Sequence, residues 1–133
     1  MKIFLDTNIF LDLILKREHY KESLYILNAI SKGLFDAYIL DITLLNIDYV
    51  AKKQVKDIRA FLNEVNKIST VLGANNDTFS KALELNHNDL EDNVQYISAK
   101  ANACELILTN DQKFYSPDIV TFSSEEFINK YLK

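Results

Sequence analysis

The sequence has few of the residues that interrupt or cross-link a chain. Only two glycines, Gly33 and Gly73, and one proline, Pro117, occur among 133 residues. Because Gly and Pro are the main residues of turns, we expect helices to dominate and long loops to be rare. The single cysteine, Cys104, excludes an internal disulfide. The lone cysteine, together with the absence of a signal-peptide pattern at the start of the sequence, favours a reducing, cytoplasmic location.

Long apolar runs and an excess of positive charge are also missing. No apolar stretch is long enough to span a bilayer, so we expect no membrane partner. The net charge of −4 does not by itself indicate nucleic-acid binding, although acidic clusters that hold cations would also lower it. Hydrophobic residues make up 48% of the chain, which argues against disorder. A single domain over residues 1–133, large enough to bury a core, is expected.

Short apolar runs alternate with segments of helical periodicity along the chain. Strands are expected at residues 3–5, 37–40, 70–72, 105–109 and 118–122. Helices are expected at residues 9–15, 20–33, 42–53, 57–68, 76–86 and 90–103, with a terminal helix after the capping-box spacing Ser123 to Glu126. Asp41 is expected to cap the helix that begins at Ile42. This alternation predicts a three-layer α/β/α fold with a central parallel sheet of four to five strands.

Two of the expected strands are each followed by an aspartate. Asp6 comes directly after the first strand, and Asp111 follows the strand at 105–109 through Thr109 and Asn110. The carboxyl ends of strands are where ligands bind in open α/β sheets. Each aspartate is therefore a candidate metal ligand, and the two together are more informative than either alone.

The helix expected at 90–103 contributes a third aspartate. Its apolar residues form two stripes, and Asp92 stands at the head of the stripe that contains Tyr96 and Ala99. In isolation, Asp89 could cap this helix and Asp92 could be the reciprocal partner in the cap. The two strand-end aspartates favour a different interpretation, in which the carboxylate of Asp92 points into the same site.

The helix from Ile42 offers two polar candidates, Asn46 and Asp48. Ile42, Leu45, Asn46, Tyr49 and Val50 share one face, which we expect to point inward. Asp48 lies nearly opposite, where it can pair with Lys52 at i+4. Asn46 is therefore the predicted inward group. Its amide oxygen can bind a hard cation, but it brings no negative charge.

Taken in order, these residues resemble the PIN domain family over essentially the whole chain. Asp6-Thr7-Asn8, Asn46, the Asp92 helix with Tyr96 and Ala99, and Thr109-Asn110-Asp111 carry the resemblance. It is closest to small single-domain proteins of the VapC toxin type. The resemblance implies an endoribonuclease that hydrolyses RNA phosphodiester bonds with Mg²⁺ or Mn²⁺. It also implies an RNA substrate, a small antitoxin protein as partner, and a homodimer.

Carried over residue by residue, the family pattern assigns the site. Asp6, Asp92 and Asp111 match acidic positions and would be both metal ligands and catalytic residues. Asn46 stands where the family usually has a glutamate, and would be a fourth, neutral metal ligand. Smaller roles in orienting the carboxylates or a bound water fall to four residues: Thr7, Asn8, Thr109 and Asp89. Glu91 and Asp89 could compensate for Asn46 if the start of their helix were frayed.

Two other classes of function share part of this pattern. A catalytically weak PIN-like domain that binds RNA or protein is favoured by Asn46, and a nuclease assay with metal would separate it from the enzyme. A phosphotransfer domain also places an aspartate after its first strand. That class needs a second acid beside Asp6 and a lysine after a later strand, whereas position 8 is Asn and position 111 is Asp.

The remaining polar residues receive less weight. His19 and His87 are interpreted as ordinary surface or capping residues rather than general bases. Arg17 and four basic residues between 52 and 59 are solvated charges that could also form a rim guiding RNA phosphates. The four are Lys52, Lys53, Lys56 and Arg59.

Overall fold

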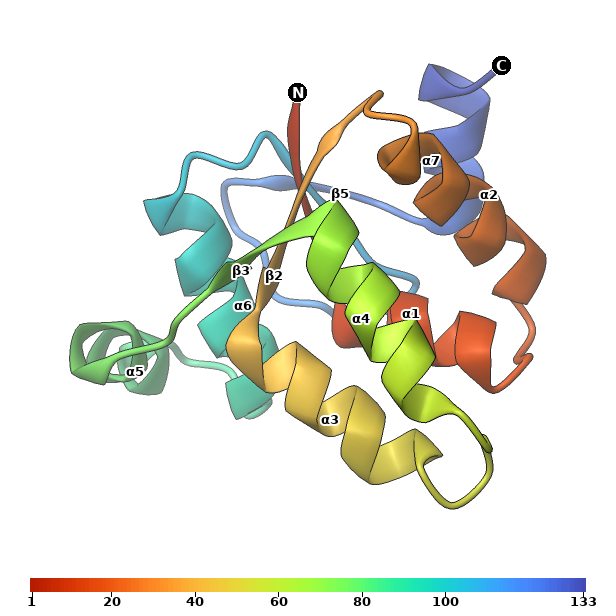
Figure 1. Cartoon of the computed structure of the whole chain (residues 1–133). Coiled ribbons are helices and arrows are strands. Elements are labelled where there is room, and N and C mark those ends of the chain that lie inside the picture. Colours follow the sequence, from red (N-terminus) through yellow and green to blue (C-terminus); the bar gives the residue numbers. More distant parts are fainter.

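The computed structural model describes residues 1–133 and contains one sheet of five parallel strands (Figure 1). The strands are β1 (Lys2–Leu5), β2 (Asp36–Leu40), β3 (Ser69–Leu72), β4 (Leu106–Leu108) and β5 (Val120–Phe122). Their order across the sheet is β3-β2-β1-β4-β5, and every neighbouring pair is parallel. The predicted α/β fold with a parallel sheet is confirmed, with five strands.

Seven helices cover the two faces of this sheet. They are α1 (Thr7–Ile14), α2 (Tyr20–Ser31), α3 (Asp41–Ala51), α4 (Ile58–Ile68), α5 (Asn76–Glu84), α6 (Leu90–Ala101) and α7 (Ser124–Tyr131). Ile3 and Leu5 of β1 join the larger core with α1, α2, α3, α4 and α7, whereas Phe4 joins the smaller core with α5 and α6. Successive strand residues point to opposite faces, so the sheet separates two cores and the layers number three (Figure 1).

Of the two caps predicted at helix starts, the one before α7 is confirmed and the one at Asp41 is wrong. The capping box at the start of α7 is present: Glu126 N donates to Ser123 Oγ at 3.1 Å, and Ser123 N donates to Glu126 Oε1 at 3.0 Å. The expected cap at Asp41 is wrong, because Asp41 is itself the first residue of α3. Its carboxylate accepts the N–H of the adjacent Ile42 at 2.7 Å. Gly33, at φ +82°, supplies the left-handed residue after α2.

The predicted buried face of α3 is also wrong. Leu45 and Tyr49 are 69% and 71% exposed, and the buried residues of the helix are Thr43, Ile47 and Ala51. Apolar residues surround most of this helix, so periodicity offers more than one face to bury. Packing against α1 and α4 selects the face that contains Thr43, and leaves the other apolar residues at the surface.

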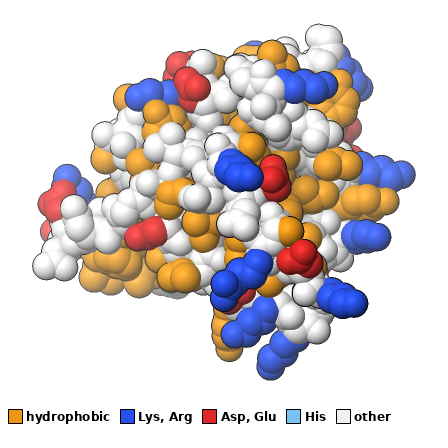
Figure 2. Space-filling view, in the orientation of Figure 1, with side chains coloured by type: hydrophobic (Ala, Val, Ile, Leu, Met, Phe, Trp, Pro, Cys, Tyr) orange, Lys and Arg blue, Asp and Glu red, His pale blue; other side chains and the backbone are white.

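Basic side chains gather on one part of the surface. Figure 2 shows them along the lower edge of the view, over the connection between α3 and α4. This connection carries Lys52, Lys53 and Lys56, and Arg59 follows in the first turn of α4; all four are exposed, and we call them the basic patch. The net charge of −4 therefore coexists with a local concentration of positive charge.

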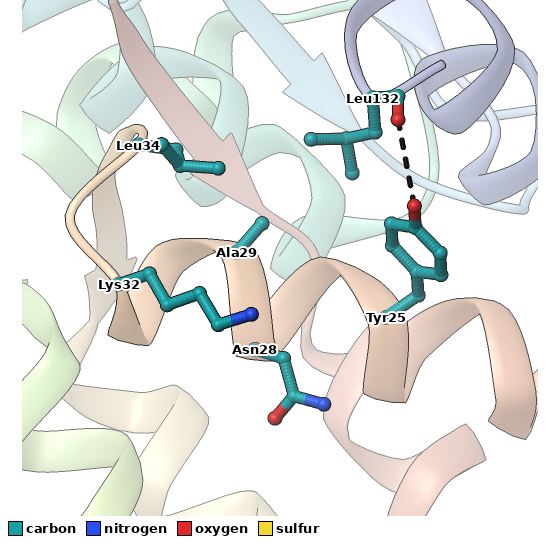
Figure 3. A pocket seen from close by; sticks show the side chains of 6 residues that line it. All are labelled: Tyr25, Asn28, Ala29, Lys32, Leu34 and Leu132. Atoms are coloured by element: carbon teal, nitrogen blue, oxygen red, sulfur yellow. Dashed lines mark hydrogen bonds between the residues drawn. The ribbon is translucent and has the colours of Figure 1, made fainter.

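A groove of about 390 Å³ lies between α2 and α7, on the side of the larger core (Figure 3). Its lining residues are Tyr25, Asn28, Ala29, Lys32, Leu34 and Leu132. The hydroxyl of Tyr25 donates to the carbonyl of Leu132 at 3.4 Å across it. No carboxylate side chain lines this groove, so it is not the predicted site. No helix of the chain has both the length and the apolar character to cross a bilayer.

Candidate active site

The candidate site lies where the order of the strands reverses. From β1 the chain moves to β2 on one side, while β4 pairs with β1 on the other side. Asp6 follows β1 and Thr109 follows β4, and Asp6 N donates to the carbonyl of Leu108 at 3.0 Å. Ligands bind at such switch points, outside the carboxyl ends of the strands. The topology thus places Asp6 and Thr109 side by side.

Asp6 is held by two side chains. Its Oδ1 accepts from Gln95 Nε2 at 3.0 Å, and its Oδ2 accepts from Thr109 Oγ1 at 2.8 Å. The carboxylate is only 2% exposed, and this burial raises its pKa above the usual value of 3.8. The charge of Asp111 adds to the rise, whereas these hydrogen bonds and the backbone N–H of Asn8 oppose it. The side chain of Asn8 itself is exposed.

Sequence reasoning missed Gln95, which is fully buried in α6. Its Nε2 donates to Asp6, and its Oε1 accepts the backbone N–H of Thr7 at 3.3 Å. A signal was available, since Gln95 lies three residues after Asp92 and therefore on the same side of the helix. The inward stripe predicted for this helix contained Asp92, Tyr96 and Ala99, so Gln95, which fixes the orientation of Asp6, was not predicted.

Asp92 lies among the other carboxylates of the candidate site. Asp89 caps α6 by accepting Asp92 N at 3.1 Å, but Asp89 N donates to His87 Nδ1, so Asp92 does not complete a capping box. The carboxylate of Asp92 is 7% exposed, and its pKa is raised from 3.8 to about 7. Burial is the main cause, and the rest comes from four neighbouring carboxylates: Asp6, Asp89, Asp111 and Glu91. We call these five residues the acidic cluster.

Asn46 lies beside this cluster, although the helix face that selected it was wrong. Its Nδ2 donates to Glu91 Oε1. Burial, followed by the charges of Asp6 and Asp89, raises the pKa of Glu91, and hydrogen bonds from Asn46 and Thr7 oppose the rise. The start of α6 is capped rather than frayed, yet Glu91 still reaches this position. A carboxylate therefore stands next to the amide of Asn46.

Asp111 lies at the exposed edge of the site. Its N–H donates to Thr109 Oγ1 at 3.1 Å, and its Oδ1 accepts Lys113 N at 2.9 Å. Thr109 therefore links Asp6 to the turn that carries Asp111. Asp92 and Asp111 line the same polar cavity of about 270 Å³, whereas Asp6 and Asn46 are not among its lining residues.

The donor set suits a hard divalent cation. Every candidate ligand offers oxygen, and no Lys or Arg is among the groups that shift the pKa of Asp6, Glu91 or Asp92. None of the five carboxylates forms an ion pair with a basic side chain, so they repel one another, and a bound cation would relieve this repulsion. No three His, Cys, Asp or Glu side chains already stand at a spacing that would enclose a metal ion. Mg²⁺ does not require such a cage, since it keeps several waters and takes one or two carboxylates.

Comparison with known proteins agrees with this fold. The sequence model of the PIN domain family matches residues 2–113. The chain therefore belongs to the PIN domain family. It is 33% identical over 137 residues to ribonuclease VapC1 of Aquifex aeolicus strain VF5, an alignment that covers 98% of this chain and 95% of that protein. The chain is thus a homologue of a VapC ribonuclease over nearly its whole length.

Solved structures show the same fold. The chain matches VapBC2 of Rickettsia felis bound to a DNA fragment from its promoter with a TM-score of 0.69 and 20% identity, covering 92% of this chain and 98% of the other. A toxin–antitoxin complex from Klebsiella pneumoniae gives a TM-score of 0.69 and 19% identity, covering 92% and 97%. At these identities the likeness shows the fold alone.

Proposed function

We propose that this protein is an Mg²⁺- or Mn²⁺-dependent endoribonuclease and the toxin of a toxin–antitoxin pair. The acidic cluster at the switch point of the sheet carries this proposal. Homology to ribonuclease VapC1 over 98% of the chain supports the choice of RNA as the substrate. The phosphotransfer class has no such support, because the chain is a PIN domain.

The proposed roles follow from how each side chain is held. Asp6, Asp92 and Asp111 would hold the cation, with Asn46 as a neutral fourth ligand. When bound, the cation would lower the pKa of a water molecule and polarise the phosphoryl oxygen of the substrate. Gln95 and Thr109 each donate to one oxygen of Asp6, which fixes the orientation in which this carboxylate would meet the cation.

The alternative of a catalytically weak binding module depends on the missing carboxylate at position 46. Glu91 weakens that argument, because it accepts a hydrogen bond from Asn46 and belongs to the same acidic cluster. A carboxylate contributed by α6 supplies negative charge where the family usually has it on α3. We therefore favour the active enzyme.

The basic patch on the α3–α4 connection suits the RNA substrate. Lys52 lies six residues after Asn46, which corresponds to roughly 9 Å along a helix axis. Lys52 and the other exposed side chains of the basic patch could attract phosphates on either side of the cleaved bond. The acidic cluster alone would repel them.

The partner proposals are a homodimer and a small antitoxin. The apolar residues that α3 leaves exposed, Leu45, Tyr49 and Val50, form a surface that a second copy of this chain would cover. The antitoxin proposal is supported by the homologue's class and by the complexes in which PIN-like neighbours were solved. The single-domain organisation of residues 1–133 and the cytoplasmic location stay predictions. Burial raises the pKa of the Cys104 thiol to about 11, so this thiol stays protonated and unreactive.

A nuclease assay on the purified, partner-free protein tests the proposal. We expect cleavage of RNA in Mg²⁺ or Mn²⁺ and none in excess chelator. Asp6→Ala and Asp92→Ala should each remove nearly all turnover. Both variants lose like-charge repulsion, but Asp6→Ala also leaves Gln95 and Thr109 without their acceptor, so circular dichroism checks that each variant is folded. Asp48→Ala, on α3 but outside the acidic cluster, is the matched control and should keep full activity. Cleavage that persists in chelator or in both cluster variants would rule out the mechanism.

A further inference from the structure

A cavity beside the acidic cluster contains an aromatic ring and a cation that the proposed hydrolysis does not use. This cavity of about 270 Å³ is lined by His87, Asn88, Asp89, Asp92, Asp111 and Lys113. We propose that it binds one unstacked base of the RNA next to the cleaved phosphate. The imidazole of His87 would be the stacking surface, and the ammonium of Lys113 would contact the adjoining phosphate. This inference rests on the proposed function.

The ring of His87 is fixed in place without any ligand. It stacks on Tyr115 with ring centroids 5.3 Å apart and an interplanar angle of 22°. Its Nδ1 accepts the N–H of Asp89 at 3.4 Å, and its carbonyl accepts Asn93 Nδ2 at 2.9 Å. Tyr115 in turn meets the buried Tyr96 edge-on, with centroids 6.0 Å apart. A surface held in this way loses little conformational freedom when a flat ligand stacks on it.

The chemistry of the cavity suits a base better than a phosphate. Of its three acids, Asp92 and Asp111 would hold the cation, whereas Asp89 lies outside the proposed metal ligands. The carboxylate of Asp89 repels a phosphate but can accept hydrogen bonds from the amino and imino groups of a base. Because His87 Nδ1 accepts a hydrogen bond, its Nε2 carries the proton in the neutral ring and can donate to a base. The volume is at the small end of ligand pockets, which limits the occupant to a single base.

Lys113 is placed to contact the backbone of the same nucleotide. It follows Asp111 by two residues, it is exposed, and it is the one cation among the residues that line the cavity. Its backbone N–H donates to Asp111 Oδ1, which ties its position to a proposed metal ligand. A base in the cavity and a phosphate at Lys113 would place the nucleotide beside Asp92 and Asp111. RNA-binding proteins commonly recognise splayed-out bases by stacking on aromatic side chains that include histidine.

The test compares a short RNA that is cleaved once with the same RNA made abasic at the nucleotide next to the cleavage site. Binding is measured by fluorescence anisotropy with Ca²⁺ in place of Mg²⁺, and kcat and KM are measured with Mg²⁺. We expect the abasic change to weaken wild-type binding about tenfold and to leave His87→Ala almost unaffected. On intact RNA, His87→Ala should raise KM with little change in kcat. Lys113→Ala should weaken both RNAs equally.

Three further variants separate recognition from folding. His87→Phe and Tyr115→Phe keep their rings and should keep the base dependence, whereas Tyr115→Ala, which releases His87, should lose part of it. His19→Ala changes the other histidine of the chain and should behave as wild type. An equal loss on intact and abasic RNA for His87→Ala, or no loss, overturns the inference and leaves the nuclease in place. If wild type cleaves no RNA, the proposed function fails, and the Ca²⁺ binding data alone decide about the cavity.

Discussion

Asn46 is the residue at which this site departs from the usual set of acids. Its amide donates to Glu91, so the two side chains form a neutral–acidic pair where a second carboxylate would create repulsion. Asp92 shows what such repulsion does, since burial and four neighbouring charges raise its pKa to about 7. At the proposed metal site, the amide would therefore lower the affinity for the cation and also lower the electrostatic repulsion in the metal-free protein.

A carboxylate at position 46 should raise the affinity for the cation and increase the repulsion in the metal-free protein. We expect Asn46→Asp to bind Mn²⁺ several-fold more tightly, because it adds a charge within reach of the cation. In chelator the same variant should be less stable by on the order of 1–2 kcal/mol, because it loses the hydrogen bond to Glu91 and faces it with a like charge. Calorimetric titration and thermal melts measure both effects. An unchanged affinity of Asn46→Asp for Mn²⁺ would show that Asn46 is not part of the metal site. Asp48→Asn, on the same helix, is the control variant.

The metal-free protein should become less stable as the pH rises. Asp92 ionises near 3.8 when unfolded and near 7 when folded, so between these values the folded state holds a proton that the unfolded state has lost. The free energy of unfolding therefore falls from about pH 4 to about pH 7. A tenfold difference in the acid constant corresponds to about 1.4 kcal/mol. We therefore expect the free energy of unfolding to fall by on the order of 2 kcal/mol between pH 5 and pH 8.

Denaturant melts in chelator at pH 5 and pH 8 measure this difference. Asp92→Asn cannot ionise at this position and should show a smaller difference; the raised pKa values of Asp6 and Glu91 act in the same direction and account for what remains. Stability that instead rises over this range, or a wild-type slope retained in Asp92→Asn, would contradict the ionisation assigned to Asp92.

At the scale of elements, α6 is attached to β1 and α1 through a buried amide. Gln95 bridges the N–H of Thr7 and the carboxylate of Asp6. Replacement by Leu would leave both groups buried without that partner. An unsatisfied buried polar group costs about 1–3 kcal/mol, and we expect Gln95→Leu to lose on the order of 2–4 kcal/mol of stability.

Nuclease activity should fall in the same variant, because Asp6 loses the donor that orients Oδ1. Chemical denaturation and the nuclease assay follow the two effects separately. The control is Gln54→Leu, which changes an exposed glutamine in the α3–α4 connection and should leave stability within about 0.5 kcal/mol. A Gln95→Leu protein with wild-type stability and activity would show that α6 does not depend on this bridge.

At the scale of the whole molecule, the exposed apolar face of α3 should decide the oligomeric state. Light scattering should report a dimer for the wild type and a monomer for Tyr49→Glu and Leu45→Glu, because a charge at the centre of a packed interface must be desolvated. Leu83 on α5 is similarly exposed, at 67%, and Leu83→Glu should remain a dimer. A monomeric wild type at all concentrations would contradict the proposed homodimer.

The sequence by itself determined the class of fold and the elements that build it. Local patterns predicted these elements correctly, namely apolar runs such as Ile3–Leu5 and the alternation of strands with helices. Apolar runs indicate parallel strands because such strands are buried on both faces of the sheet. The same patterns identified Asp6 and Asp111 as strand-end acids, and the Ser123 cap followed from residues three apart. These signals lie within a few neighbouring positions, where chain geometry alone fixes which side chains can meet.

Only the tertiary structure decided which faces are buried and which neutral groups complete the site. Thr43, rather than Leu45, faces inward because α3 must pack against α1 and α4, and no periodicity within α3 encodes that choice. Gln95 and Glu91 meet Asp6, Thr7 and Asn46 across separations of 45 to 89 residues. Such meetings depend on the order of the strands and the docking of α6, so they follow from the assembled sheet and not from any one segment.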